Sequence, residues 1–478
     1  MLSLTLAVAG CVEVGPDYER PAAIVPAHYK EFKGWKLASP RDDDPKGEWW
    51  TALRDPELNR LEPMVAVSNQ TVIADAANYR QALALLAEAR AGLAPLLNFN
   101  PSLMRSSPGA DALNAQASAS WTLDVWGKLS RTVEEQSAAA QASAGLRANA
   151  TLAAQAALAL AYVQLRQADS LHALLAKTVA SYKRSVDMAQ NQYNAGTAAK
   201  SDLITAQALL LQTRAQLINT EVARAQSEHA IAVLAGRPPA ELAIAPGRLA
   251  DDLPASPARV PSELLERRPD IAAAERFMQQ QNAAIGVAIA GYFPDITISG
   301  AFGYAGNPFV RQIASVNPVW SYGLSLAQPL LNGGLTDAQV AAARATYESS
   351  VATYRQTVLT AFQQVEDNLA AIRVLSDEIV VQIKATKAAE QAVDIAINEY
   401  RAGTQSYTTV VTAEAIALAD EQTLLSTRAL RLSATVNLIV ALGGGWRRDE
   451  LPQLDASTAT QGGGDRKQGA SLAPGSTR

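Results

Sequence analysis

The sequence predicts a mainly α protein with membrane-type β-strands, in which long antiparallel helical hairpins are joined to four strands. Three observations predict this fold. The chain repeats itself at an offset of about 207 residues. Each half carries apolar residues at helical spacing over about 65 residues, or roughly 100 Å of helix. Each half also contains segments in which apolar residues alternate with small or polar ones, as in membrane barrels.

Composition narrows the class of protein. Of 478 residues, 48% are hydrophobic and 18% are charged, and the net charge is −5. This balance argues against nucleic-acid binding, which needs concentrated Lys and Arg. Beyond the N-terminal segment there is no run of about 18 apolar residues, so we expect no membrane-spanning helix. The single cysteine excludes an internal disulfide and a thiolate metal site.

The cysteine closes a short apolar run. Cys11 follows the sequence LAVAG at 6–10, and small residues before a lone cysteine form a lipobox; a chance cysteine in a signal segment is the alternative. We expect residues 1–10 to be a truncated signal peptide, because they lack Lys and Arg and are short. We expect diacylglycerol and palmitate on Cys11, a stable anchor. The residue that follows Cys11 is Val12 and not Asp, which favours sorting of the lipoprotein to the outer membrane.

Three pairs of matching segments reveal a tandem duplication. They are 193–197 with 400–404 (offset 207), 231–236 with 439–444 (offset 208) and 91–95 with 290–294 (offset 199). We therefore divide the chain into a lipidated, irregular N-terminal segment at 11–68, a first repeat at 69–236, a linker at 237–269, a second repeat at 270–444 and a largely disordered tail at 445–478.

Each repeat is expected to contain a helix of about 25 residues, a very long helix and a returning helix. The predicted ranges are 69–94, 129–194 and 201–235 in the first repeat, and 270–293, 335–401 and 408–442 in the second. In the second repeat the apolar residues from Tyr347 to Ile383 follow each other at steps of three or four, so they share one helix face.

The strands are expected within 96–126 and 295–331. Ile296 and Ile298 alternate with Thr297 and Ser299, and each stretch approaches the 9–11 residues that a spanning strand needs. An aromatic girdle is expected from four residues near one strand end: Phe302, Tyr304, Trp320 and Tyr322. A soluble hairpin with one buried face is the alternative, and Pro101 argues against a strand there.

The number of strands has a consequence of its own. Two hairpins supply four strands, and four strands cannot close a barrel in lipid, where unpaired backbone edges are forbidden. If the strands span the membrane, several copies of the chain must share one barrel.

The turns between the long helices contain glycine at matching places. Gly196 and Gly403 suit the left-handed position that follows a helix. Ser201 and Thr408 are predicted to cap the returning helices with their hydroxyls. These turns are expected to be the far tips of the hairpins.

Several motifs resemble one known family. The segments are VGPDYERP at 14–21, LLERRPDI at 264–271, FQQVEDNL at 362–369 and the paired Tyr-x-Ala-Gly-Thr turns. Together they resemble the TolC superfamily of outer-membrane efflux channels, in its OprM/NodT-type lipoprotein branch. The resemblance implies a homotrimer with a shared 12-stranded barrel and a periplasmic α-barrel. It also implies a periplasmic adaptor and an inner-membrane RND pump as partners, with outer-membrane lipid around the strands and no cofactor or metal.

The resemblance also assigns roles at the tips. It implies a periplasmic aperture formed by Tyr193, Asp202, Tyr400, Gln405, Thr409 and Thr412. It implies adaptor-docking turns formed by Gly196, Thr197, Gly403 and Thr404. The sequence departs from the family pattern, since Gln405, Thr409 and Thr412 stand where ionic partners are expected. Asp202 either narrows the aperture or simply favours a helix N-terminus.

We expect a passive exit duct for small molecules rather than an enzyme. His28, His172 and His229 lack metal-ligand spacing, and no nucleophile constellation or phosphate-binding loop is found. A structural helical lipoprotein of the envelope, without a pore, is the alternative. A periplasmic adaptor is disfavoured because the chain has two hairpins and no flanking lipoyl-like module.

Overall fold

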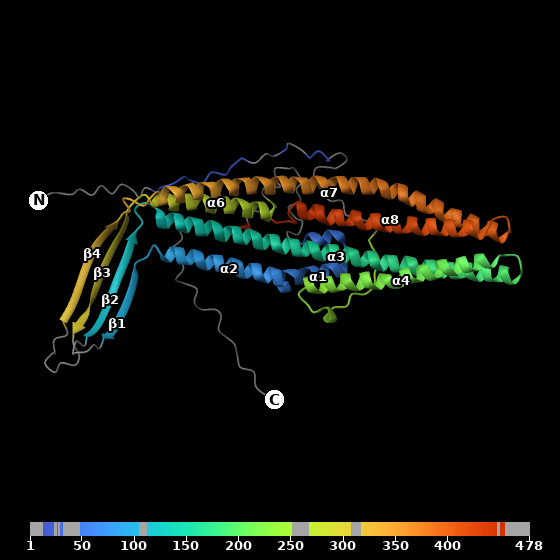
Figure 1. The fold of residues 1–478 in the computed structure, drawn as a ribbon, viewed down its shortest axis with the longest axis horizontal. Coiled ribbons are helices and arrows are strands. Elements are labelled where there is room, and N and C mark those ends of the chain that lie inside the picture. Colours follow the sequence, from blue (N-terminus) through green and yellow to red (C-terminus); the bar gives the residue numbers. More distant parts are fainter. Residues whose placement is uncertain are drawn as a thin grey trace, which may run out of the picture.

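The computed structural model describes residues 13–22, 26, 29–31, 48–104, 112–250, 267–306, 317–446 and 450–454. Over these residues the chain is elongated: a body of long helices carries a β-sheet at one end and two helix-to-helix turns at the other (Figure 1). Cys11, the segment 1–10 and the tail beyond residue 454 lie outside the described residues.

The elements occur in the predicted order. They are η1 (Trp49–Leu53), α1 (Pro56–Ser68), α2 (Gln70–Ala91), β1 (Leu96–Met104), β2 (Ala112–Leu123), α3 (Lys128–Asn194), α4 (Lys200–Leu234), η2 (Pro239–Glu241), α6 (Pro269–Ala290), β3 (Asp295–Gly306), β4 (Asn317–Ala327), α7 (Leu335–Arg401) and α8 (Tyr407–Ala441). The ends of the predicted helices are confirmed to within three residues, and all four strands lie in the predicted ranges.

Helix α1 corrects one expectation, because residues 56–68 were predicted to be irregular. The Asp55 carboxylate caps the helix by accepting hydrogen bonds from Glu57 N (2.9 Å) and Leu58 N (3.1 Å), and Pro56 occupies the first turn. Leu61, on the buried face, joins the central core of the body. Pro63 inside the helix masked the pattern, yet packing against α3 holds α1 in place.

The duplication is visible in the helix lengths. α3 and α7 each have 67 residues, and α4 and α8 each have 35. Both ends of both long hairpins correspond at an offset of 207. Gly236 (φ 70°) therefore matches Gly443 (φ 97°), and the predicted offset of 208 at this place is wrong by one residue.

The two repeats are joined to their long helices in the same way. α2 and α4 lie end to end along α3, while α6 and α8 lie end to end along α7 (Figure 1). At the first junction Asn69 Nδ2 donates to the carbonyl of Leu234 (2.9 Å). At the second, an Arg268 nitrogen donates to the carbonyl of Ala441 (3.1 Å). α3 also packs on α6 and α8, which unites the repeats.

The sheet has the order β1-β2-β3-β4 and is antiparallel throughout. Residues directly opposite each other share a face. Phe302 faces Trp320 on the apolar face, and Ser299 faces Gly323 on the polar one. Pro101 lies in the edge strand β1, where proline is tolerated, so the objection it raised is removed.

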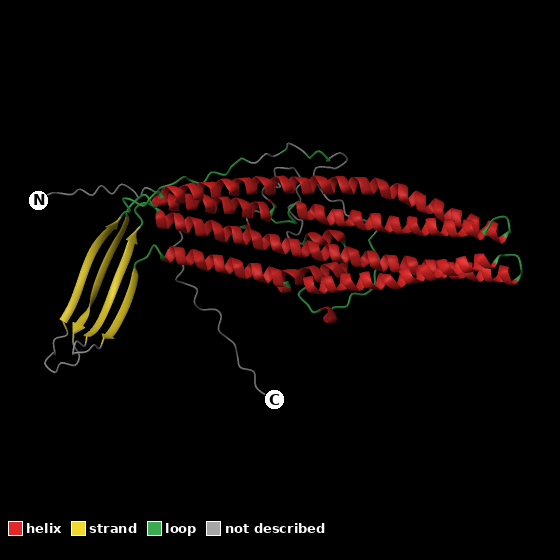
Figure 2. Cartoon of the chain, in the orientation of Figure 1, coloured by secondary structure: helices red, strands yellow, loops and turns green. Residues whose placement is uncertain are grey.

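No helix covers the apolar face of the described sheet, which projects away from the body (Figure 2). Tyr322 and Leu324 are 83% and 70% exposed. A soluble hairpin would bury such a face, so that alternative is contradicted by the structure. Among the described helices, α8 is long and apolar enough to cross a bilayer, but 44% of that stretch is buried inside the body.

Candidate functional site

Aromatic residues mark both ends of the apolar face. The predicted girdle forms two ring pairs, Phe302 with Tyr304 (centroids 5.7 Å apart) and Trp320 stacked on Tyr322 (5.8 Å). Both pairs lie in the half of the sheet away from the helices, since β3 leaves the body at its first residue and β4 returns to it. The ring nitrogen of Trp121, at the opposite end, donates to the carbonyl of Leu93 (3.0 Å), and a place for Trp121 in a girdle was not predicted.

The sheet has two edges without a hydrogen-bonding neighbour. β1 pairs only with β2, and β4 pairs only with β3, over the described residues of these strands. The outer backbone groups of both strands therefore need partners from outside the chain if the apolar faces lie in lipid.

The tips confirm the glycine prediction. Gly196 and Gly403 have φ values of 75° and 73°, in the left-handed region. In the first tip, Thr197 N donates to the carbonyl of Gln192 (2.9 Å) and Gly196 N donates to that of Tyr193 (3.0 Å), which is the Schellman pattern. The second tip repeats these bonds.

The predicted hydroxyl caps are wrong. The residues that precede α4 and α8 are Ala199 and Ser406, neither of which makes a side-chain capping bond. Ser201 and Thr408 lie inside the helices. The hydroxyls that matter belong to Thr197 and Thr404, which donate to the carbonyls of Gln192 and Glu399 (3.0 Å each) and close the turns.

The two tips share an apolar core, in which Ala189 and Leu203 of the first hairpin pack with Tyr400 and Tyr407 of the second. Tyr400 is 4% exposed and its ring lies 5.1 Å from that of Tyr407, which is fully buried. Tyr400 therefore belongs to the core of the tip, and its predicted place on the aperture surface is corrected. Burial raises the pKa of Tyr400, and the charge of nearby Asp202 adds to the effect.

The other predicted aperture residues are at least partly exposed to solvent. Asp202 is half-buried, whereas the remaining residues of the set are exposed at the tips: Tyr193, Gln405, Thr409 and Thr412. The docking turns are exposed as well: Gly196, Thr197, Gly403 and Thr404. The structure thus gathers all of these residues at one end of the molecule.

A buried carboxylate connects the two hairpins behind the tips and was missed by sequence reasoning. Glu414 of α8 accepts a hydrogen bond from Ser185 Oγ of α3 (2.8 Å), and its carbonyl accepts one from the Tyr182 hydroxyl (3.0 Å). Burial raises the pKa of Glu414. An acid between Val410 and Ala417 on an otherwise apolar helix face was the available signal.

The VGPDYERP motif lies in an extended N-terminal segment, called the strap here, of which residues 13–22, 26 and 29–31 are described. Val14 N donates to the carbonyl of Trp126 at the junction of sheet and helices (3.2 Å). Asp17 pairs with Arg131 (2.9 Å), and a Cβ added to Gly15 would lie 2.6 Å from the Cα of Gly286. The motif residues therefore tie the strap to the body.

The FQQVEDNL motif also holds the strap against the body, at residues 30 and 31. The Glu366 carboxylate accepts hydrogen bonds from the backbone of Lys30 (2.7 Å) and Glu31 (2.9 Å). Glu366 thus fixes the strap to α7, and it has a structural task.

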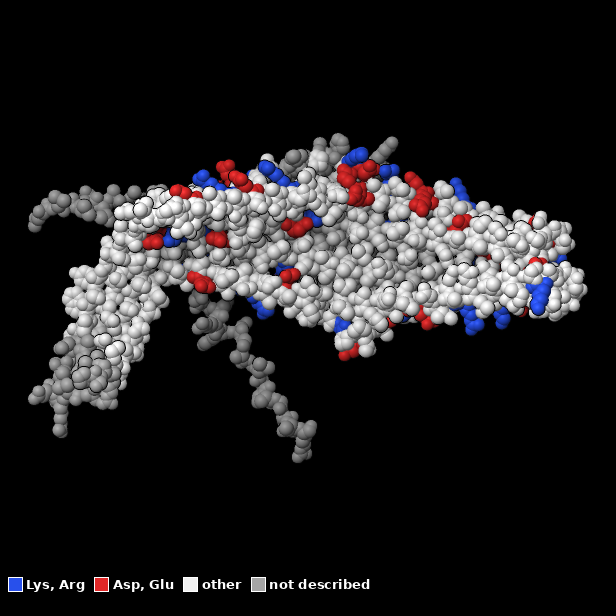
Figure 3. All heavy atoms as spheres, in the orientation of Figure 1, with Lys and Arg blue, Asp and Glu red and all other residues white. Residues whose placement is uncertain are grey.

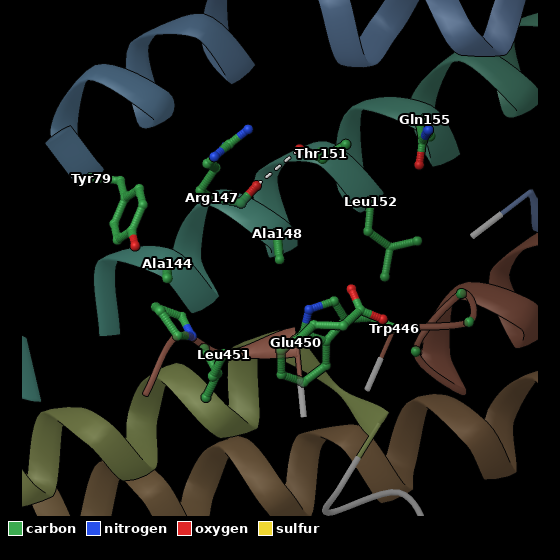
Figure 4. A pocket seen from close by; sticks show the side chains of 14 residues that line it. Tyr79, Ala144, Arg147, Ala148, Thr151, Leu152, Gln155, Trp446, Glu450 and Leu451 are labelled. Carbon is green, nitrogen blue, oxygen red and sulfur yellow. Dashed lines mark hydrogen bonds between the residues drawn. The ribbon is translucent and has the colours of Figure 1, made fainter. Parts of the chain in front are cut away.

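A cavity of about 530 Å³ lies between α2, α3 and the turn that follows α8 (Figure 4). Tyr79, Arg147 and Trp446 point toward it, and Thr151 bonds the backbone carbonyl of Arg147 (3.0 Å). Its lining brings no nucleophile and base together. Within the described ranges, no cluster of three or more His, Cys, Asp or Glu could hold a metal ion.

Comparison with known proteins decides the family. The family model described as "outer membrane efflux protein" matches residues 63–237 and 260–444, which is well over half of the chain. The chain belongs to the outer membrane efflux protein family. It is therefore an efflux channel protein of the outer membrane, of the TolC type, and not an enzyme.

Individual members of the efflux family align over most of their length. The toluene efflux pump outer membrane protein TtgC of Pseudomonas putida is 28% identical over 93% of this chain and 95% of its own. The probable outer membrane lipoprotein SilC of Salmonella typhimurium is 27% identical over 93% and 98%. The solved outer-membrane channel OprN superposes with a TM-score of 0.84 at 27% identity, covering 91% of this chain and 99% of its own.

Proposed function

We propose that three copies of this efflux protein form one exit duct, which receives small molecules from an inner-membrane RND pump through a periplasmic adaptor. The observation that carries the proposal is the sheet with two unpaired edges and an uncovered apolar face. Lipid would cover the apolar face, and the edge strands of neighbouring copies would form backbone hydrogen bonds with each other. Three chains with four strands each give a closed barrel of twelve.

Exposed apolar seams on the helical body support the same ring. α4 exposes Ile204, Leu211 and Ile218, which are spaced by seven residues. α7 exposes Val374 and Val381 at the same spacing. In the order α2/α4, α3, α6/α8, α7, these helices form the two outer edges of the body. A heptad seam on α4 of one copy can therefore pack on α7 of the next.

The opposite ends of the chain suit a membrane anchor and a docking surface. Val14 is bonded to the junction of sheet and body, and three residues reach about 10 Å. An acylated Cys11 would thus meet the bilayer surface beside the barrel. The exposed Gly-Thr turns would receive the adaptor, and three copies of Asp202 would ring the aperture.

The test is the oligomeric state and conductance of the purified, acylated protein in detergent. We expect a heat-modifiable trimer that forms ion channels in planar bilayers. The double variant Leu211→Glu/Ile218→Glu should weaken the trimer by placing like charges in the seam, whereas Gln212→Glu/Asn219→Glu, on the adjacent exposed face, should not. A monomer without conductance would refute the proposal and favour a pore-free envelope lipoprotein.

A further inference from the structure

The four described strands contain a single charged residue. Asp295, the first residue of β3, is the only Asp, Glu, Lys or Arg among them. The rest of the polar face consists mainly of Ser, Thr, Asn, Gln and small residues, with Leu96, Met104 and Val319 on the edge strands. The sheet is free of charge on the face seen in Figure 3. Since lipid takes the apolar face, the polar face is the wall of the duct.

Asp295 does not stand alone, because Lys128 Nζ lies 3.0 and 3.1 Å from its two carboxylate oxygens. Lys128 is the first residue of α3. The two side chains are 41% and 53% exposed, so the pair borders open space.

The surroundings place this pair on the duct side. A hollow of about 320 Å³ is lined by Lys128, Asp295, Thr122 and Thr297, among others. The two threonines are directly paired on the polar face of β2 and β3, with their hydroxyl oxygens 3.4 Å apart. Lys128 therefore adjoins the polar face at its base, where the helical body meets the sheet.

Asp124, the other acidic residue that lines this hollow, already has hydrogen-bond partners in α3. The Asp124 carboxylate accepts hydrogen bonds from Leu129 N (2.8 Å) and Ser130 N (2.7 Å), so the start of α3 compensates its charge. In the second repeat, the counterparts of Lys128 and Asp124 are Leu335 and Leu331 at the offset of 207. The Lys128–Asp295 pair thus occurs once per chain.

We propose that the Lys128–Asp295 pair sets the charge preference of the duct where the helical body opens into the barrel. The inference rests on the proposed trimer, in which three pairs would form a ring. While each pair is intact the ring is neutral, so the barrel passes anionic and cationic compounds alike. Breaking the pairs exposes three like charges.

The expected effect follows from the size of the barrel. Twelve tilted strands spaced about 4.8 Å apart give a radius of roughly 12 Å. The Debye length at 0.1 M salt is about 10 Å, so the charges still act at the axis. Three unpaired charges should change the cation-to-anion permeability ratio roughly threefold.

The test is the reversal potential of single channels in a KCl gradient near 0.1 M. Asp295→Asn should shift the channel toward anions and Lys128→Gln toward cations, and the double variant should return close to the wild type. Arg60→Gln removes one charge from another exposed ion pair, on α1 (Arg60–Glu57, 2.5 Å), and should change nothing. Because an exposed pair contributes little to stability, all variants should assemble.

A labelling experiment avoids dependence on the folding of separate variants. In Lys128→Cys the new thiol can be modified on the assembled channel with a sulfonate or a trimethylammonium thiosulfonate reagent. The two labels should move the permeability ratio in opposite directions. Conducting channels whose ratios are the same in all these forms would overturn the proposal, whereas a wild-type protein without conductance would overturn the trimeric duct itself.

Discussion

Glu62 provides a sharp test of the energetics of the helical body. It lies in α1, its side chain has no exposed surface, and neither carboxylate oxygen has a hydrogen-bond partner among the residues that the structure describes. Burial alone raises the pKa of Glu62 from its ordinary value of 4.5 to about 9. At neutral pH the folded protein therefore holds a proton that the unfolded chain releases.

The sign and size of the effect follow from this proton. The folded pKa exceeds the unfolded one, so the stability is fully present below pH 4.5 and is lost progressively up to pH 9. At about 1.4 kcal/mol per pH unit, the loss reaches about 3 kcal/mol per chain at pH 7. Gln resembles the protonated acid and has no charge to neutralise. Glu62→Gln should therefore stabilise the protein by up to about 3 kcal/mol at pH 7.

Thermal unfolding followed by circular dichroism measures this gain. With about 2 cal/mol/K of unfolding entropy per residue, the gain should raise Tm by about 3 °C at pH 7 and vanish near pH 4.5. Glu57→Gln is the matched control on the same helix, because the hydrogen bond to Arg60 lowers the pKa of Glu57 and its charge is favourable. A Tm for Glu62→Gln at or below wild type at pH 7, or a gain that persists at pH 4.5, would refute the reasoning.

Three further predictions concern the ends of the long hairpins. Asp202→Ala should raise single-channel conductance or weaken cation selectivity, since three like charges leave the aperture; an unchanged channel would reject that role. Because burial raises the pKa of Glu414, packing of the tips should loosen as pH rises; hydrogen exchange should show this, and Glu414→Gln should abolish the pH dependence. Gly196→Ala, in open space, should cost about 1 kcal/mol through its left-handed backbone alone. Gly443→Ala should cost more, because its Cβ would also meet a backbone carbonyl, and equal losses in denaturant unfolding would contradict this account.

Local patterns in the sequence determined the elements of this efflux channel protein. An apolar stripe at steps of three or four residues is typical of a long helix, and alternation is typical of a strand. The helices of the two repeats were therefore predicted to within three residues, and the four strands fall within the two predicted β stretches. The left-handed conformation of Gly196 and Gly403 was also predictable from local sequence. A helix often ends with one residue in the left-handed conformation, and glycine adopts it without strain. Because the chain contains an internal repeat, each element was predicted once in each half of the sequence.

Contacts between distant segments were decided by the tertiary structure alone. Burial of Tyr400 depends on how the two hairpins pack, because its core also contains Ala189 and Leu203 of the first hairpin, and no local spacing contains that information. The same holds for the Glu414 bond to Ser185 across 229 residues and for Lys128 beside Asp295 across 167. Periodicity reports which face of an element is apolar, but the identity of the surface that covers it is settled only when the elements meet.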